Sequence, residues 1–245
     1  MTRATFTLVG IVFLYLAITA PAKPAPTPCP GMVSIRDCRT PCSGNAELNK
    51  QKNVRSKWGP STLRTIAWMR VLPNPSKADC LSRNTARLRQ LGEGQKITVV
   101  GWALAARAGS PESCNCYLRA KQDKDNHMVL VSPSLRHPTL TDNEQNSVTV
   151  EFTPRVRLGH PNFTQEKLEP LIDPTWRPGQ TCKRGKLLVR VTGVLMFDTE
   201  HYCVMPKLKR ATNWEIHPIL KFEYCAKGKT CRADSDENWI DFDDL

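Results

Sequence analysis

The stretch Lys186–Phe197, KLLVRVTGVLMF, alternates apolar and polar residues over much of its length, with the period of a β-strand. Gly193 interrupts the run, which indicates a half-buried strand that bends there or lets another backbone approach. Lys96–Leu104, KITVVGWAL, has the same form, with Gly101 inside a β-branched run. Two curled strands of this kind predict a small β-barrel.

Three further strands and one helix complete the predicted barrel. We expect strands at 96–106, 127–131, 147–153, 186–197 and 213–224, the last broken near Pro218, and a helix at 162–172 capped by Asn162. This β-β-β-α-β-β order is that of the OB-fold, a partly open five-stranded barrel. The predicted fold class is therefore mainly β, an OB-like barrel, with a β-sandwich or a mixed α+β sheet as the competing interpretation.

The 245 residues divide into four predicted segments. They are an export signal at 1–22, a proline-rich linker and helical, cysteine-containing extension at 23–92, the barrel at 93–226 and an acidic tail at 227–245. In the extension we expect one helix that starts at Ser61 and ends before Pro73, and a second at 78–91.

The signal is inferred from a positive residue, Arg3, followed by an apolar run too short to span a bilayer comfortably. Cleavage after Ala22 would follow a small-x-small pattern. We therefore expect a secreted or periplasmic protein that does not insert into a membrane once the signal is removed.

Export makes disulfides the expected state of the ten cysteines. They are Cys29, Cys38, Cys42, Cys80, Cys114, Cys116, Cys182, Cys203, Cys225 and Cys231. Connectivity cannot be deduced from spacing alone. The first three are close enough to staple the N-terminal arm, and Cys225 and Cys231 could close a short loop after the last strand.

The formal charge of +12 marks a basic protein, although its last twelve residues hold six acids and no base. A basic body attracts polyanions such as nucleic acid or acidic polysaccharide. The alternative is surface charge that serves solubility and has no dedicated partner.

In OB-folds the ligand usually sits on strands two and three, flanked by the loops that join strands one to two and four to five. The first of these loops carries Glu112, Cys114, Cys116, Asp123 and Asp125 and ends at His127. The other carries Asp198, Glu200, His201 and Cys203, and the next strand carries Trp214, Glu215 and His217. We expect these residues to converge at one end of the barrel.

Three interpretations of this convergence compete. In the first it is structural, with Cys114 or Cys116 bridged to Cys203. In the second, imidazole and carboxylate groups bind a divalent metal such as zinc; the residues concerned are His127, Asp198, Glu200, His201 and His217. In the third, a histidine beside a carboxylate acts as the general base of a metal-dependent, nuclease-like hydrolase.

The favoured functional prediction is a binding module, not an enzyme, for an anionic ligand such as single-stranded nucleic acid. Such strands are held by aromatic stacking in a positive groove. The candidate residues are Trp102, Tyr117, Arg119, Arg155, Arg157, Arg190 and Trp214, with a place in the core as the alternative for the two tryptophans.

Several phrases together resemble a group of uncharacterised exported bacterial proteins. The most specific are ESCNC at 112–116 and WEIHP at 214–218, supported by Asp125-x-His127, by ExTPR at 151–155 and by FDxEH at 197–201. The resemblance covers roughly 94–224. It implies a shared architecture and a site near these polar motifs, and it implies no particular activity.

Overall fold

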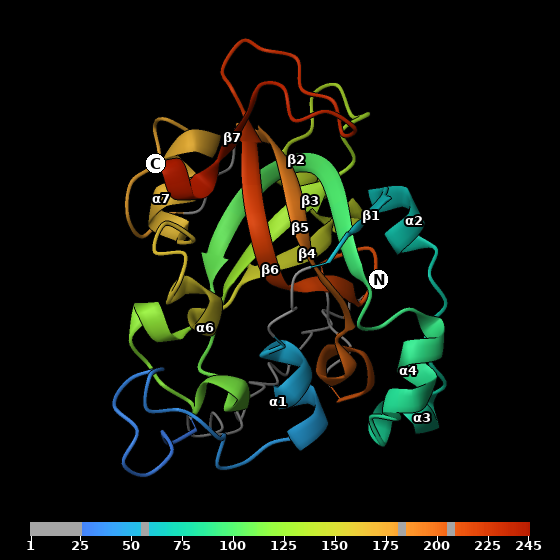
Figure 1. Ribbon diagram of the computed structural model, residues 1–245, viewed down its shortest axis with the longest axis vertical. Helices are drawn as coiled ribbons and strands as arrows, with labels where there is room; N and C mark the ends of the chain where they lie inside the picture. The colour runs from blue at the N-terminus through green and yellow to red at the C-terminus, as the bar shows by residue number, and fades with distance from the viewer. Residues whose placement is uncertain (1–25, 55–58, 181–184, 205–208) are drawn as a thin grey trace, which may run out of the picture.

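The structure is a computed structural model that describes residues 26–54, 59–180, 185–204 and 209–245. Its centre is a closed five-stranded barrel, seen side-on in Figure 1. The barrel strands are β2 (Lys96–Ala108), β3 (Asn126–Val131), β4 (Val148–Phe152), β5 (Leu187–Phe197) and β6 (Trp214–Cys225). The predicted export signal, at 1–22, lies outside the described residues.

The order of pairing closes the cylinder. β2 pairs with β3, β3 with β4, β4 with β6, β6 with β5, and β5 returns to β2. β4 and β6 run parallel, whereas the other pairs of the barrel are antiparallel. The mainly β, OB-like prediction is confirmed, including the helix between the third and fourth barrel strands, α7 (Gln165–Ile172).

The two glycines that interrupt the strand patterns are sites of close approach, as predicted. A Cβ on Gly193 would lie 2.4 Å from Ile216 Cγ2 and 2.4 Å from the carbonyl oxygen of Pro218. A Cβ on Gly101 would lie 2.6 Å from Ile66 Cδ1. β6 is one continuous strand through Pro218, so the predicted break is instead an irregularity in its pairing with β5, whose register shifts on both sides of Gly193.

The extension before the barrel differs from its prediction. Its elements are α1 (Ala46–Lys52), β1 (Thr62–Arg64), α2 (Ile66–Arg70), α3 (Lys77–Leu81) and α4 (Thr85–Leu91). The helix expected to start at Ser61 instead begins with a strand, because β1 pairs in parallel with the part of the β2 edge that β3 does not reach. The helix expected at 78–91 is two helices, separated at Arg83, whose φ of 52° lies in the left-handed region.

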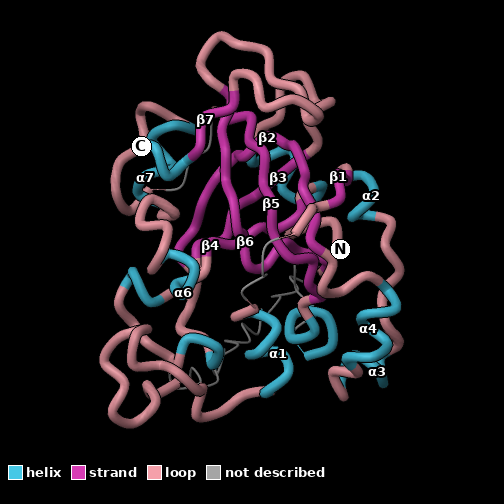
Figure 2. The backbone as a smooth tube through the Cα atoms, viewed as in Figure 1, coloured by secondary structure: helices cyan, strands magenta, loops and turns pink. Residues whose placement is uncertain are grey.

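Short helical segments fill the loops of the barrel. They are η1 (Ser113–Asn115), η2 (Lys121–Asp123), α5 (Leu140–Asn143), η3 (Glu144–Asn146), α6 (Pro154–Arg157) and η4 (Glu200–Val204). Figure 2 shows them as cyan turns around the magenta strands. Thr164, not Asn162, caps α7, because the side chain of Asn162 instead donates to the C-terminal carbonyls of Asp243 and Leu245.

The end of the acidic segment is packed against the barrel. β7 (Trp239–Asp241) pairs with β6, and η5 (Phe242–Asp244) follows it. The Phe242 side chain is fully buried among Phe152, Phe163 and Phe222. The last residues are therefore an element of the fold.

Four disulfides link the described residues: Cys29–Cys42, Cys38–Cys116, Cys80–Cys203 and Cys225–Cys231. The predicted closure of a short loop by Cys225 and Cys231 is confirmed. The predicted bridge from Cys114 or Cys116 to Cys203 is wrong, because Cys116 bonds to the N-terminal arm and Cys203 to α3. Cys182 lies outside the described residues.

Candidate functional site

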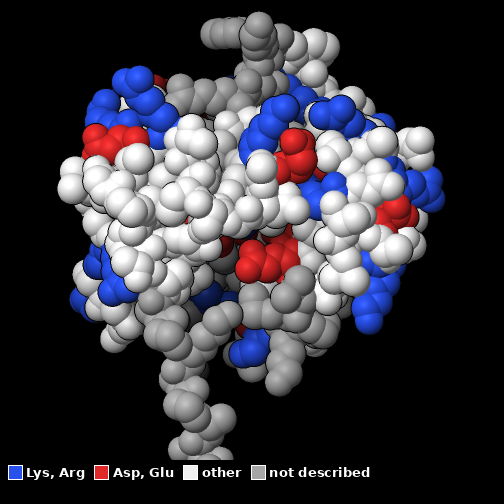
Figure 3. Space-filling view, turned by 90° about the horizontal axis from the view of Figure 1, so that it is seen from below, with Lys and Arg blue, Asp and Glu red and all other residues white. Residues whose placement is uncertain are grey.

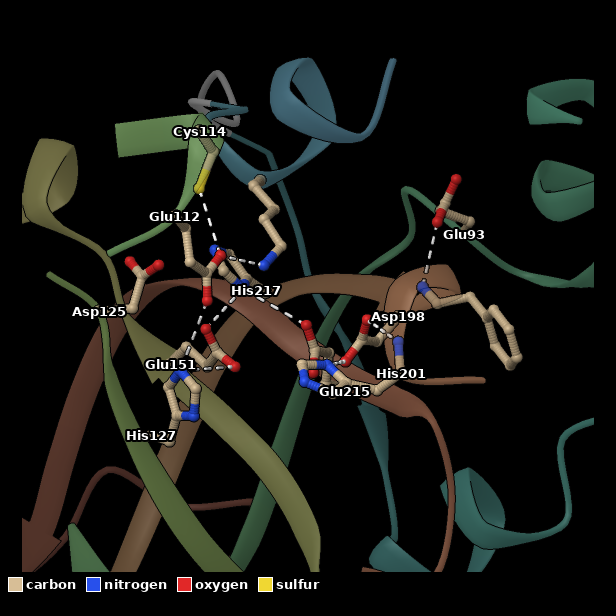
Figure 4. A network of polar contacts seen from close by, with 12 residues as sticks. Glu93, Glu112, Cys114, Asp125, His127, Glu151, Asp198, His201, Glu215 and His217 are labelled. Atoms are coloured by element: carbon tan, nitrogen blue, oxygen red, sulfur yellow. Dashed lines mark hydrogen bonds and ion pairs between the residues drawn. The ribbon is translucent and has the colours of Figure 1, made fainter. Parts of the chain in front are cut away.

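The two loops predicted to converge line one cavity of about 340 Å³. Its wall includes Glu112 and His127 from the first loop region and Asp198 and His201 from the second, together with Glu151 of β4. Figure 4 shows these side chains in one connected network. The premise that the barrel brings two distant connecting segments together is therefore confirmed.

Strand alternation places the polar side chains on the face that turns away from the hydrophobic core. Val150 of β4 and Ile216 of β6 are paired and belong to the core. Their neighbours Glu151 and Glu215 point to the other face, which the loops and α1 cover. His127 is paired with Glu151 in the β3–β4 register. The cavity thus lies on strands two and three of the barrel, where an OB-fold usually binds its ligand.

A lysine from the extension closes one side of the network. Lys52, at the end of α1, is 5% exposed, and its Nζ lies 2.5 Å from Glu112 Oε2. Burial opposes its charged form, but Glu112 and the other nearby carboxylates together raise the pKa of Lys52 well above its usual value. The Cys38–Cys116 disulfide ties the segment before α1 to the loop that carries Glu112.

Three buried groups meet behind the cavity, and we call Asp125, Glu151 and His217 the buried triad. Asp125 and His217 are completely buried, and Glu151 is 3% exposed. One potential ligand atom from each lies within 4.8 Å of the others.

The triad is short of hydrogen bonds for groups so deeply buried. Asp125 Oδ1 and both ring nitrogens of His217 have no hydrogen-bond partner among the described residues. His217 Nδ1 lies 2.8 Å from Glu151 Oε2, so these two groups form an ion pair when the imidazole is protonated. Unsatisfied buried polar atoms are rare, and an ion that belongs at the site is one explanation for them.

Electrostatics couples the members of the triad. Burial and the nearby Glu112 carboxylate raise the pKa of Asp125 to about 6. Burial opposes the charged form of His217, but Glu151 and Glu215 outweigh it and raise the pKa of this imidazole to about 10. Burial likewise opposes ionisation of Glu151, yet His127 and His217 hold the pKa of that carboxyl well below its usual value.

A thiol adjoins the triad. Cys114 is buried and is the free cysteine among the described residues. Its Sγ lies 3.5 Å from Glu112 Oε2, and it forms a second group with Glu112 and Asp125 within 4.8 Å. Burial and the Glu112 charge raise the pKa of the thiol well above its usual value, so it is a neutral S–H in this state.

On the other side of the cavity, Asp198 orients His201. Asp198 Oδ2 lies 2.6 Å from His201 Nδ1 and accepts a second bond of 2.6 Å from Arg210. Arg210 also donates to Glu215, whose other oxygen lies 3.4 Å from His217 Nδ1. Through Arg210 and Glu215 the histidine–aspartate pair is joined to the buried triad.

The predicted metal set is divided between these two places. His217 belongs to the buried triad, and His127 lies beside it, with Nε2 3.5 Å from Glu151 Oε1. Asp198 and His201 form the separate pair, whereas Glu200 is exposed and does not line the cavity. Asp125 and Glu151 were missing from the set, although both lie in phrases that the sequence singled out. Lys52 was not predicted as a site residue.

The residues predicted to bind nucleic acid have varied positions. Trp214 is fully buried, with its Nε1 bonded to the Pro73 carbonyl, so no ring face is open to a base. Trp102 is partly exposed, and Lys186 Nζ lies 4.3 Å from its ring centroid. Arg190 is buried in ion pairs with Glu223 and Asp236, at another cavity. Trp214 therefore takes the alternative place in the core, and Arg190 is engaged in ion pairs within the protein.

The remaining candidates lie nearer the surface. Tyr117 is partly exposed, and Arg119 is exposed and donates to the Pro26 carbonyl. Arg157 bonds the side chain of Asn126 and the carbonyl of Lys124. Arg155 bonds the carbonyl of Cys38 and lines a separate cavity of about 620 Å³. In Figure 3, separate basic and acidic groups lie among uncharged residues on the face seen from below.

No helix among the described residues is long and apolar enough to cross a membrane. The four disulfides suit an oxidising compartment. No protein-family model, curated protein or solved structure matches the chain.

Proposed function

We propose that this protein is an exported binding module whose site is the buried triad and whose ligand is a divalent cation. The observation that carries the proposal is the closeness of three buried ligand groups, Asp125, Glu151 and His217, within 4.8 Å of one another, with Asp125 Oδ1 and His217 Nε2 lacking a hydrogen bond to any described residue. Buried polar atoms without partners cost free energy, and a coordinated cation would satisfy all three side chains at once.

The charge balance of the network supports a cation. Five carboxylates face two permanently charged bases, Lys52 and Arg210; the carboxylates are Glu112, Asp125, Glu151, Asp198 and Glu215. His217, whose pKa is raised to about 10, would lose its proton on coordinating a metal, and the carboxylates would then outnumber the bases. An anion placed directly on these carboxylates would be repelled, whereas a divalent cation would be attracted.

The donor types indicate which cations to test. Carboxylate oxygen and imidazole nitrogen suit zinc and manganese, and three protein ligands leave positions for water or substrate. His127 and Glu112 stand at the edge of the triad and could complete the coordination or hold a bound water. Magnesium and calcium prefer sites made of oxygen alone, so we expect weaker binding of these ions.

The test is calorimetric titration of the metal-free full chain with Zn²⁺ and with Mn²⁺. We expect one site, and a loss of affinity of at least tenfold in Asp125→Asn and Glu151→Gln. Glu47→Gln, an exposed carboxyl of α1, is the matched control and should bind as the wild type does. A wild-type protein that binds neither ion would show that the network is a structural ion cluster.

A different cavity supports the anionic ligand predicted from the sequence. The cavity of about 620 Å³ is lined by Arg39, Lys50 and Arg155, and its described lining contains no carboxylate. We infer that this surface is where a phosphate-bearing ligand such as single-stranded DNA would bind. Binding of a labelled oligonucleotide should weaken steeply with salt and in Lys50→Gln. Absence of binding at low salt ends this idea.

Secretion or location in a periplasm is part of the proposal. It is supported by the apolar N-terminal run of the sequence and by the disulfides. We also propose that the resemblance to exported bacterial proteins reflects a common barrel. Support comes from the ESCNC and WEIHP phrases, since Glu112, Cys114, Glu215 and His217 all belong to the network around the cavity.

A further inference from the structure

We propose that the cavity hydrolyses a phosphate ester, with His201 as the general base and a water molecule as the nucleophile. This inference rests on the cation site proposed above, which would bind the phosphate group and offset its charge. It adds to that site a reaction, a base and a substrate class.

The cavity has two sides, each with a histidine and at least one carboxylate. Glu112, His127 and Glu151 belong to the wall beside the buried triad, and Asp198 and His201 belong to the other. A volume of about 340 Å³ is near the lower end of the range found for small-molecule sites. Glu151 is the member of the buried triad that lines this cavity together with His201, so a small ester in the cavity would reach the cation site at Glu151.

The contacts of His201 fix one of its ring nitrogens and leave the other available to accept a proton. Its Nδ1 is 2.6 Å from Asp198 Oδ2, and its backbone N–H donates to Asp198 Oδ1 at 3.2 Å. The ring lines the cavity and its side chain is 36% exposed, while Nε2 has no hydrogen bond to a described residue. A carboxylate that fixes one nitrogen leaves the other free to take a proton.

Two constraints fix the position of this pair. Arg210 donates to the same Asp198 oxygen at 2.6 Å, which keeps the carboxylate ionised and in place. The Cys80–Cys203 disulfide ties η4, the segment that carries His201, to α3.

Bases at the cavity edge would offset the carboxylates of its lining and contact an anionic substrate. Lys209 is exposed and has no ion pair to a described residue, and Arg107, which pairs with Glu144, also lines the cavity. Together with the cation they would bind the phosphate oxygens and stabilise charge that develops during the reaction. Neutral carboxylic esters would gain much less from these groups.

The reaction balances without a redox change. His201 Nε2 takes one proton from water as the water oxygen forms a bond to phosphorus. The bond from phosphorus to the leaving oxygen breaks, and that oxygen keeps the electron pair and takes a proton from solvent or from His201. The products are a free alcohol and a phosphate with one ester bond fewer.

The test uses the full oxidised chain loaded with Mn²⁺ or Zn²⁺. The probes are bis(p-nitrophenyl) phosphate and p-nitrophenyl phosphate, with p-nitrophenyl acetate as the comparison. We expect turnover of at least one phosphate ester, and a fall in kcat of about 100- to 10,000-fold in His201→Asn with metal affinity unchanged. His137→Asn, the same change at an exposed histidine outside the cavity, should match the wild type.

The outcomes separate this inference from the cation proposal. Wild-type protein that binds metal but turns over neither phosphate ester overturns the hydrolase and leaves the metal site standing. Wild-type protein that binds no metal removes both. Preferential cleavage of the acetate overturns the substrate class, and full activity in a folded His201→Asn variant overturns the role of His201.

Discussion

Replacement of Phe242 by alanine tests whether the acidic C-terminal segment is part of the folded core. The side chain is fully buried, and its ring centroid lies 5.0 Å from that of Phe222, 5.9 Å from Phe152 and 6.2 Å from Phe163. Removing a buried phenylalanine ring costs about 3–5 kcal/mol, because transfer free energy is lost and a cavity remains. That is a large part of the roughly 5–15 kcal/mol by which a domain is stable.

The assay is urea unfolding of the oxidised protein, followed by circular dichroism and tryptophan fluorescence. With a denaturant dependence of about 2 kcal/mol per molar urea, the midpoint should fall by about 1.5–2.5 M. Leu245→Ala is the control, because that side chain is 42% exposed and its loss should change stability by about 0.5 kcal/mol or less. A midpoint for Phe242→Ala equal to that of the control would refute the packing described for η5.

Three further predictions concern buried or ion-paired groups. Glu93→Ala should destabilise the protein by about 3–5 kcal/mol in chemical unfolding, because the buried Arg83, 2.8 Å away, would lose its counterion; a loss below about 1 kcal/mol would contradict this pairing. The Cys114 thiol should react with a chromogenic disulfide reagent only after denaturation, and failure to detect any thiol then would mean that Cys114 is bridged. The hydrogen bond to Asp198 raises the pKa of His201, although burial opposes this. The contribution of this bond to folding stability is therefore complete below pH 6.5, the ordinary pKa of histidine, and is lost as the pH rises through the raised pKa. The difference in unfolding free energy between wild type and His201→Asn should therefore be larger at about pH 5.5 than at about pH 9, and equal differences would contradict it.

The barrel was predictable because its signals are local. Alternation in Lys186–Phe197 and Lys96–Leu104 reports which face is buried, and a glycine inside such a run reports a place where a Cβ cannot fit. The order of strands and helix then restricts the topology to few choices. The polar loops were also identifiable, since they follow directly from where the strands end.

Pairing across long sequence separations had no such local signal, and only the tertiary structure decided it. Cys116 is bonded to Cys38, 78 residues away, and Lys52 reaches Glu112 from a helix outside the barrel. Which carboxylates surround His217 depends on the register of β4 beside β6, because a shift of one residue would turn Glu151 into the core. The positions and order of the strands can be predicted from the alternation of apolar and polar residues in the sequence. Which side chains meet at a binding site depends on distances that only the closed barrel fixes.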